Sequence, residues 1–335
     1  MKVAVLGATG LVGREMLAVL EQRNFPVDEL VPLASARSAG RDLLFRGREW
    51  TVREVEDSAF DGVQLALFSA GSEASRRWAP VAAGKGTVVI DNSSAWRMDP
   101  EVPLVVPEVN RRALKGHRGI IANPNCATIQ ALVALYPLHL EAGLESFTAV
   151  TFQSVSGTGK AALEELREGT EAFLSGKAFE PKVYPRPIAF NAIPQIGSFD
   201  DEGISQEEWK MVNESRKILG IPDLAVSCTT VRVPVFRGHS EAITAIFRTP
   251  LSPERARAIL KEAPGVALAG EAGPDSYATA LDVPGTDAVV VGRIRRDTGS
   301  GSGLSHWVVA DNLRKGAALN AVQIAEELLS TGHLI

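Results

Sequence analysis

The residue best placed to do chemistry in this chain of 335 amino acids is Cys126. The strand-like run that begins at Ile120 ends in Asn123-Pro124-Asn125, and the residues from Cys126 onward have helical periodicity. Backbone N–H groups at a helix start lack partners within the helix, and the helix dipole adds partial positive charge there. Both effects favour the thiolate, the nucleophilic form of cysteine. The pattern predicts a reactive thiol; the alternative is a buried cysteine that only packs.

A second candidate site is a glycine-rich turn near the N-terminus. Lys2 to Leu6 is a short apolar run of the buried parallel-strand type, and Arg14 to Gln22 has helical periodicity. Between them, Gly7 permits a tight turn, Gly10 lets the backbone approach a pyrophosphate, and Gly13 lets the helix pack on the strand. The spacing is GxxGxxG rather than GxGxxG, and an ordinary strand–helix turn is the alternative. The strand–turn–helix context favours a dinucleotide cofactor.

The end of the next predicted strand bears on which dinucleotide would bind. Leu30 to Ala34 runs into a segment in which Arg37 stands between Ser35 and Ser38, with no acid at the strand tip. An acid there would bind the ribose 2′-hydroxyl of NAD, whereas an arginine flanked by hydroxyls suits the 2′-phosphate of NADP. The sequence therefore favours NADP, unless Arg37 belongs to an ordinary solvated loop.

Composition excludes several classes of protein. Hydrophobic residues make up 45% of the chain and charged residues 22%, as in ordinary globular proteins. A formal net charge of −5 argues against a nucleic-acid partner. Only two cysteines occur, and Cys228 lies in an alternating run where we expect it to pack. The cysteines and five scattered histidines have no metal-site spacing. We expect a cytoplasmic protein without a metal, signal peptide or membrane contact.

The first part of the chain predicts the sheet that would position these residues. Strand-like and helical runs alternate there, with strands expected at Lys2–Leu6, Leu30–Ala34, Val63–Ser69, Thr87–Asp91, Val102–Val106 and Ile120–Ala122. Such alternation is typical of a Rossmann-type, doubly wound parallel sheet, an α/β fold that binds ligands at the carboxyl ends of its strands. The polar segments Ser69–Gly71, Asn92–Arg97 and Asn123–Cys126 should therefore meet at one edge.

The second part predicts an α+β domain with a mixed or antiparallel sheet covered on one face. Its expected strands are Ser146–Gln153, Val226–Val235, His239–Arg248, Ala288–Ile294 and Ser305–Val309. Asp311 to Leu329 predicts an amphipathic helix that returns to the first domain. The domains expected are thus residues 1–125 with 311–335, and residues 126–310. The role of the loop from Lys177 to Gly203, long enough for an interface or a lid, stays open.

The sequence of the turn from Ser154 to Lys160 allows two interpretations. Its glycines and serines could support a flat nicotinamide ring, or Ser154 or Ser156 could simply cap the following helix. A nicotinamide cofactor beside a nucleophilic cysteine points to phosphorylating aldehyde chemistry. In that chemistry a thiolate attacks an acyl phosphate, phosphate leaves, and hydride reduces the resulting thioester.

Five motifs occur along the chain in this order: Gly7-Ala-Thr-Gly10-x-x-Gly13, Ser93-Ser-x-x-Arg97, Asn123-Pro-Asn-Cys126-Ala-Thr, Gln153-Ser-Val-Ser-Gly-Thr-Gly159 and Arg232-Val-Pro-x-x-x-Gly-His239. Together they resemble, end to end, the bacterial type of aspartate-semialdehyde dehydrogenase. The resemblance implies NADPH-dependent reduction of 4-phospho-L-aspartate to L-aspartate 4-semialdehyde with release of phosphate, in lysine (diaminopimelate), threonine and methionine biosynthesis. It also implies a second domain like that of glyceraldehyde-3-phosphate dehydrogenase, responsible for catalysis and homodimer formation.

By the same resemblance, Cys126 carries the acyl thioester, His239 is the acid/base and Gln153 orients the acyl group. Histidine suits acid/base work because its pKa lies near neutrality. A lone histidine at a strand start is more often structural, so only the shared motif supports His239. The oxyanion donor is expected to be the Cys126 backbone N–H, with Asn125 nearby.

The resemblance also assigns the substrate's charges. Arg97, Asn125 and Lys210 would bind the phosphate, Arg232 would bind the α-carboxylate through its bidentate fork, and Glu207 would bind the ammonium. Glu207 and Lys210 lie three apart on a helical run and so share one face, which an ordinary surface ion pair would equally explain. The cofactor contacts implied are Gly7, Thr9, Gly10, Leu11, Val12, Gly13, Ser35, Arg37, Ser38, Ser156, Gly157 and Asn312.

Two rival functions stay open. N-acetyl-glutamyl-phosphate reductase shares the architecture and the thiol chemistry, but its acylated substrate removes the need for Glu207, and its cysteine motif more often reads Asn-Pro-Gly-Cys. A catalytically silent, nucleotide-binding homologue would be expected to lose the thiol or the imidazole. Both Cys126 and His239 are present here.

Overall fold

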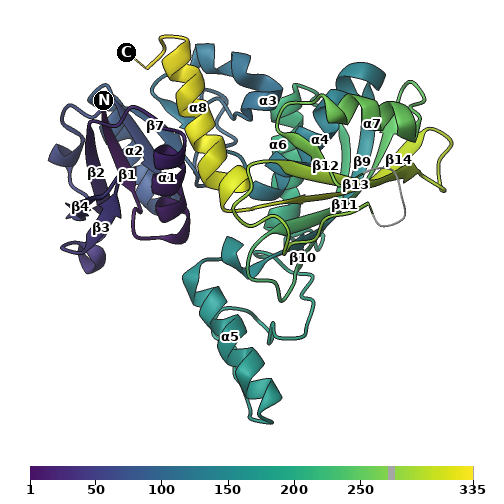
Figure 1. Ribbon diagram of the computed structural model, residues 1–335, viewed down its shortest axis with the longest axis horizontal. Coiled ribbons are helices and arrows are strands. Elements are labelled where there is room, and N and C mark those ends of the chain that lie inside the picture. Colours follow the sequence, from purple (N-terminus) through teal and green to yellow (C-terminus); the bar gives the residue numbers. More distant parts are fainter. Residues whose placement is uncertain (271–275, 335) are drawn as a thin grey trace. The chain divides into compact units, whose positions relative to one another are not determined.

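The computed structural model describes residues 1–270 and 276–334, and these form two compact units (Figure 1). One unit is Met1–Asn125 together with the C-terminal segment from Gly316, and the other is Cys126–Lys315. Within the described residues, no helix combines the length and the apolar character needed to cross a membrane.

The first unit is built on six parallel strands in the order β5-β2-β1-β6-β7-β8. They are β1 (Lys2–Leu6), β2 (Glu29–Ala34), β5 (Arg53–Glu54), β6 (Leu65–Phe68), β7 (Val88–Asp91) and β8 (Ile120–Ala122). The order runs outward from β1 in both directions. This confirms the predicted doubly wound parallel sheet.

Alternation along β1 explains why this sheet has a core on each face. Val3 and Val5 belong to a cluster with α1 (Leu11–Gln22) and α8 (Leu319–Ser330), whereas Ala4 and Leu6 belong to one with α2 (Ser72–Gly84). Successive side chains of a strand point to opposite faces, so an unbroken apolar strand needs cover on both sides. The remaining elements of the unit are η1 (Ala36–Ser38), β3 (Asp42–Phe45), β4 (Arg48–Thr51), η2 (Asp57–Phe60), α3 (Pro107–Asn110) and η3 (Arg111–Gly116).

The second unit has a mixed sheet of six strands in the order β10-β9-β11-β14-β13-β12. They are β9 (Leu144–Gln153), β10 (Ala225–Arg232), β11 (His239–Phe247), β12 (Val266–Leu268), β13 (Val289–Arg296) and β14 (Gly303–Ala310). The edge strands β10 and β12 run parallel to their neighbours, and the other pairs are antiparallel. Helices α4 (Cys126–Ala142), α6 (Gln206–Leu219) and α7 (Pro253–Lys261) pack against this sheet. This confirms the predicted α+β domain.

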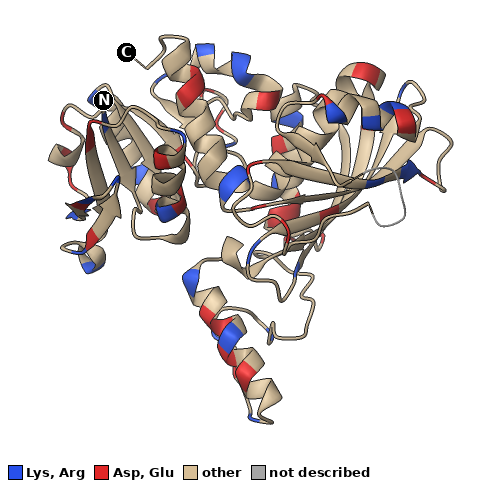
Figure 2. Ribbon diagram, viewed as in Figure 1, with Lys and Arg blue, Asp and Glu red and all other residues tan. Residues whose placement is uncertain are grey.

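Helix α5 (Lys160–Leu174), preceded by the short η4 (Val155–Gly157), extends away from that sheet, and the long loop that follows runs back along it (Figure 1). Charged residues are spread along α5, whereas the strands carry few (Figure 2). Its base is held by a small cluster that includes Val155, Leu166 and Ile188. The loop predicted between Lys177 and Gly203 thus packs against α5 through Ile188.

Two predicted elements differ from the structure. Val102 to Val106 forms a single bridge, from Leu104 to Ala122, rather than a strand. Prolines at 103 and 107 remove two ladder donors, and Pro107 begins α3. The C-terminal helix begins at Leu319 rather than at Asp311, after a π-helical turn over Arg314–Ala318.

Candidate active site

The glycine turn of the first unit has the geometry of a cofactor cradle. Gly7 has φ of +88°, and a Cβ there would collide with the Ser69 carbonyl. A Cβ at Gly13 would collide with the Gly7 carbonyl. A Cβ at Gly10, by contrast, would meet only the Gly7 oxygen, at 3.3 Å. The first and third glycines therefore serve close packing, and the second leaves the start of α1 bare, which fits a pyrophosphate.

Other expected cofactor residues of this unit surround the same strand ends. Thr9 lies in the turn, where its carbonyl accepts a hydrogen bond from Arg14 Nε (3.3 Å), and Leu11 and Val12 open α1. Ser35 to Ser38 follows β2 as a short 3-10 turn, closed by a bond from the Ser38 N–H to the Ser35 carbonyl (2.8 Å). Arg37 is exposed there. A positive side chain at this strand end is available to a phosphate.

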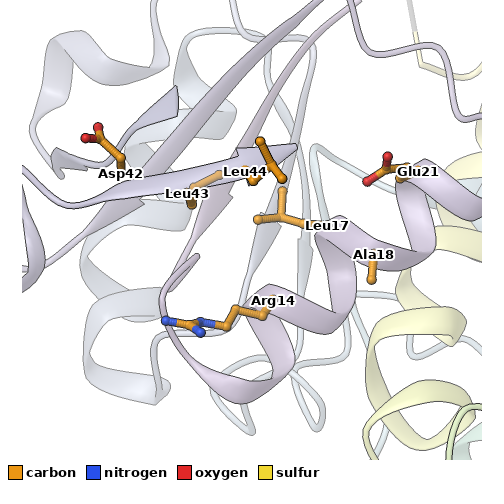
Figure 3. A pocket seen from close by; sticks show the side chains of 7 residues that line it. All are labelled: Arg14, Leu17, Ala18, Glu21, Asp42, Leu43 and Leu44. Carbon is orange, nitrogen blue, oxygen red and sulfur yellow. The ribbon is translucent and has the colours of Figure 1, made fainter. Parts of the chain in front are cut away.

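The same unit also has a hollow on its surface. It is bordered by α1 and β3 and lined by Arg14, Leu17, Ala18, Glu21, Asp42, Leu43 and Leu44 (Figure 3). None of the expected cofactor residues lines it. Its two carboxylates make it a poor place for a pyrophosphate.

Arg97 and Asn125 are both buried at the carboxyl edge of the parallel sheet. Arg97 donates from Nε to the Asn123 carbonyl (2.9 Å) and from Nη2 to the Asn92 carbonyl (2.9 Å). Two backbone carbonyls from the ends of neighbouring strands thus fix the guanidinium.

The sequence analysis did not single out Asp91, a buried acid at the end of β7. Burial raises the pKa of Asp91, although bonds from Ser93 and the charge of Arg97 oppose this. Asp91 could have been recognised in the sequence as the first residue of the polar run that follows the apolar part of β7.

Cys126 is the first residue of α4, as predicted. Its side chain is half-buried. The helix it begins is buried over most of its length and packs on β9, β11 and β14. Rigid packing of this kind holds the first turn, and with it the position of the sulfur. By contrast, burial raises the pKa of the Cys228 thiol, helped by the carboxylates of Glu241, Glu208 and Glu207.

Three strand ends meet in the second unit and bring together the expected catalytic and substrate residues. Gln153 ends β9, Arg232 ends β10 directly opposite it, and His239 begins the antiparallel β11. All three side chains are buried. The register therefore groups residues from three distant parts of the sequence.

His239 is fully buried, and its hydrogen bonds define its tautomer. The Ser154 backbone N–H donates to Nδ1 (3.0 Å), so Nδ1 carries no proton and Nε2 must carry one. Burial and the Arg232 charge lower the pKa of His239 to about 3, and the Glu207 charge opposes them. Nε2 has no hydrogen-bond partner among the described residues. The ring is therefore a neutral donor.

Gly157 lies directly against this donor. A Cβ at Gly157 would come within 3.3 Å of His239 Nε2 and 3.2 Å of Arg232 Nη1. The turn that contains it is held by Asn312, whose Oδ1 accepts from the Ser156 hydroxyl (3.2 Å) and from the Gly238 N–H (2.9 Å). The absence of a side chain at 157 keeps the space before the imidazole open.

A carboxylate and an ammonium group from α6 complete the cluster. Gln153 Nε2 donates to Glu207 Oε1 (3.2 Å), and Lys210 Nζ donates to Glu207 Oε2 (2.8 Å). Arg232 Nη1 donates to the Ser154 carbonyl (2.6 Å). Glu207 is buried, so the ion pair with Lys210 is more than a surface contact. Sequence reasoning missed Ser154 as the residue that ties Arg232 to His239.

Among the described residues, no group of three or more His, Cys, Asp or Glu side chains is placed to hold a metal ion. The two cysteines, both described, do not form a disulfide.

Comparisons with known proteins show which family the chain belongs to. Residues 2–117 match a family model described as "Semialdehyde dehydrogenase, NAD binding domain", and residues 135–315 match "Semialdehyde dehydrogenase, dimerisation domain". An aspartate-semialdehyde dehydrogenase of Aquifex aeolicus is 53% identical over 99% of this chain and 98% of its own length. One of Bacillus subtilis is 49% identical over 97% of this chain and 96% of its own.

Solved structures of similar proteins have the same fold. Aspartate semialdehyde dehydrogenase II of Vibrio cholerae, complexed with ASA, has a TM-score of 0.96 and 50% identity and covers 98% of both chains. The enzyme of Candida albicans with NADP has a TM-score of 0.76 and 25% identity, and the match covers 100% of this chain and 99% of that one.

Proposed function

Since the chain belongs to the aspartate-semialdehyde dehydrogenase family, we propose that it reduces 4-phospho-L-aspartate to L-aspartate 4-semialdehyde and releases phosphate. It would thus be an oxidoreductase of amino-acid biosynthesis, supplying the lysine, threonine and methionine routes. The observation that carries the proposal is the neutral imidazole of His239, whose Nε2 and the neighbouring Arg232 Nη1 both lie against Gly157.

The chemistry begins at the sulfur of Cys126. The thiolate attacks the acyl carbon of the substrate, the bond from that carbon to the phosphate oxygen breaks, and phosphate leaves with the bonding electrons. A thioester remains on the enzyme. The N–H groups of the first turn of α4 stabilise the thiolate and the oxyanion that forms during the attack.

When bound, the reduced nicotinamide cofactor supplies the hydride that turns the thioester into a thiohemiacetal. The glycine turn at Gly7–Gly13 would hold its pyrophosphate. His239 donates its Nε2 proton to the oxygen that gains charge. When the C–S bond breaks and the aldehyde forms, the imidazole takes this proton back and the thiolate is restored.

Charge complementarity supports the choice of substrate. Arg232 is buried beside the imidazole and offers a fork to the α-carboxylate, and Glu207 lies next to Gln153 and can accept the ammonium. Lys210 forms an ion pair with Glu207. Its ammonium group is partly exposed, and we propose that it also binds the phosphate of the substrate. Arg97 and Asn125, both in the first unit, are the other phosphate ligands that we propose.

The test is a phosphate-dependent oxidation assay in which L-aspartate 4-semialdehyde and the semialdehyde of N-acetylated glutamate compete. We expect a higher kcat/KM for the first compound, because only an unmodified ammonium uses Glu207. Faster turnover of the N-acetylated compound would assign the chain to the rival reductase instead. No turnover of either would indicate a silent homologue.

We further propose NADP as the preferred cofactor, on the strength of the exposed Arg37 and of the serines beside it. Assays with NADP and NAD side by side should favour NADP. Arg37→Ala should raise the KM for NADP about tenfold and leave that for NAD unchanged, because only NADP has the 2′-phosphate. Arg41→Ala, which removes a nearby exposed arginine, is the matched control. An equal effect on both cofactors would overturn this assignment.

A homodimer and a cytoplasmic location complete the proposal. The face of the mixed sheet away from its helices carries half-buried apolar side chains, among them Phe152, Ala242 and Trp307, as a subunit contact would need. The reducing cytoplasm would keep the proposed catalytic thiol from forming a disulfide.

A further inference from the structure

Buried asparagines link the C-terminal helix to the turn that precedes Cys126. Asn320, on α8, is fully buried, and its Nδ2 donates to Asn123 Oδ1 (2.7 Å) and to the Val105 carbonyl (2.9 Å). Asn123 is also fully buried, and its own Nδ2 donates to Asn92 Oδ1 and to the Ala317 carbonyl (3.3 Å). The Asn123 amide is thereby bonded at both of its ends.

Arg97 is attached to the same network. Its Nε donates to the Asn123 carbonyl and its Nη2 to the Asn92 carbonyl, each at 2.9 Å. Any movement of the Asn123 backbone therefore moves both the guanidinium and Asn125, two residues further along. A buried network in which every member is bonded has one favoured arrangement, because each alternative leaves a polar group unsatisfied.

We propose that Asn320 is a positioning residue for the phosphate subsite: through Asn123 it holds Arg97 and Asn125 in the arrangement that binds the leaving phosphate. The inference rests on the function proposed above for Arg97 and Asn125. Sequence patterns gave no hint of it, because Asn320 lies almost 200 positions from Asn123, within an otherwise apolar helix face.

Removing the Asn320 amide leaves two buried acceptors, Asn123 Oδ1 and the Val105 carbonyl, without their donor. The turn can satisfy them only by shifting, and Arg97 shifts with it. Small displacements at a binding or reacting centre reduce rates sharply, by as much as about 100-fold for 1 Å. The affinity for phosphate should fall first, because its proposed ligands Arg97 and Asn125 are the groups attached to Asn123.

The chain offers a matched control on the same helix. Gln323 lies one turn beyond Asn320, is half-buried, and its Nε2 donates to Glu108 Oε1 (3.0 Å). Gln323→Leu also removes an amide bond between α8 and another element of the unit, but that bond does not involve Asn123 or Arg97. This variant shows how far the kinetic constants change when α8 loses a hydrogen bond that is not connected to Asn123.

The experiment compares the wild type, Asn320→Leu, Asn320→Ser and Gln323→Leu in phosphate-dependent semialdehyde oxidation with NADP. Asn320→Ser shortens the side chain without adding bulk, and it serves if the leucine variant does not fold. We expect both Asn320 variants to raise the KM for inorganic phosphate about tenfold, with kcat at saturating phosphate within about threefold of wild type. The KM for NADP should stay unchanged.

Two results overturn the inference. One is a phosphate KM in the Asn320 variants no higher than that of Gln323→Leu. The other is a parallel loss in phosphate KM, NADP KM and kcat, which would mean general structural damage. Failure of the proposed function looks different, since the wild type itself would then show no phosphate-dependent oxidation.

Discussion

The chemistry proposed for this protein depends on the protonation state of one side chain. His239 has its proton on Nε2 because a backbone N–H occupies Nδ1, and burial keeps the ring neutral. A neutral donor suits the oxygen of the thiohemiacetal, which gains charge only during the reaction. An imidazolium would lower the energy of the ground state as well.

Arg232 gives a test at this scale. It donates to the Ser154 carbonyl, and the N–H of the same residue orients His239. Arg232→Lys replaces a planar fork with a point charge, so it should raise the KM for the semialdehyde and lower kcat, each about tenfold. Steady-state kinetics measure both constants.

Arg255→Lys is the control for this change. Arg255 is exposed and pairs with Glu141 at the surface. If Arg232→Lys had the kinetics of this control, Arg232 would not belong to the substrate site.

Among the elements, α4 and β11 carry the proposed nucleophile and the proposed acid/base, and each also carries a buried polar residue. Gln130 stands one turn after Cys126, and Glu241 two residues after His239. Both are fully buried. Neither Glu241 oxygen has a hydrogen-bond partner among the described residues. Burial raises the pKa of Glu241 well above its ordinary value.

This pKa shift predicts a pH-dependent stability. The unfolded chain ionises the carboxyl above about pH 4.3, whereas burial raises the pKa of Glu241 in the folded chain above that value. The contribution of Glu241 is therefore full below that pH and is lost as the pH rises toward its folded pKa, at about 1.4 kcal/mol per pH unit. Glu241→Gln does not titrate, so it should be increasingly more stable than wild type from pH 5 to pH 8 in urea unfolding.

Glu145→Gln, on an exposed position of β9, is the matched control and should leave this pH dependence unchanged. A Glu241→Gln variant less stable than wild type at pH 8 would show that the carboxylate is ionised and paired in the folded protein.

How far the sequence predicts these elements depends on the range of the interactions. Local patterns predicted β1, α1 and the helix that starts at Cys126, because apolar alternation and strand breakers act over a few residues. They overextended the C-terminal helix, since the Asp311 side chain accepts bonds from Arg237 and Gly285, which are distant in sequence. Local patterns also could not predict that β10 runs parallel to β9, because the direction of strand pairing depends on tertiary contacts.

The same distinction applies to the site. The types and motifs of Cys126, His239 and Gln153 were visible in the sequence, but the strand ends that bring His239, Gln153 and Arg232 together were not. Ser154 and Asn320 act through bonds to residues far along the chain, so no local pattern identifies them.

At the scale of the whole molecule, each unit has its own sheet and its own set of proposed roles. The cradle for the cofactor and two phosphate ligands lie in the first unit, and the acid/base and the carboxylate ligand lie in the second. The chain crosses from one to the other between Asn125 and Cys126. The proposed nucleophile is therefore the first residue of the unit that contains the proposed acid/base.

The proposed homodimer gives a prediction at this scale. Wild type should sediment as a dimer, and Ala242→Arg should shift it to monomer by placing a charge in the middle of the half-buried sheet face. Ser330→Arg, at an exposed position of α8, is the control. A dimer that tolerates Ala242→Arg would place the contact elsewhere.

The most direct test of the account is a single turnover without phosphate. Enzyme mixed with L-aspartate 4-semialdehyde and NADP should release about one NADPH per active site in a burst and then stop, because the thioester has no phosphate to accept it. Mass spectrometry of the quenched enzyme should find the aspartyl group on Cys126, and Cys126→Ala should give neither burst nor adduct while still binding NADP. A burst that persists in Cys126→Ala, or an adduct on another residue, would contradict the thioester route.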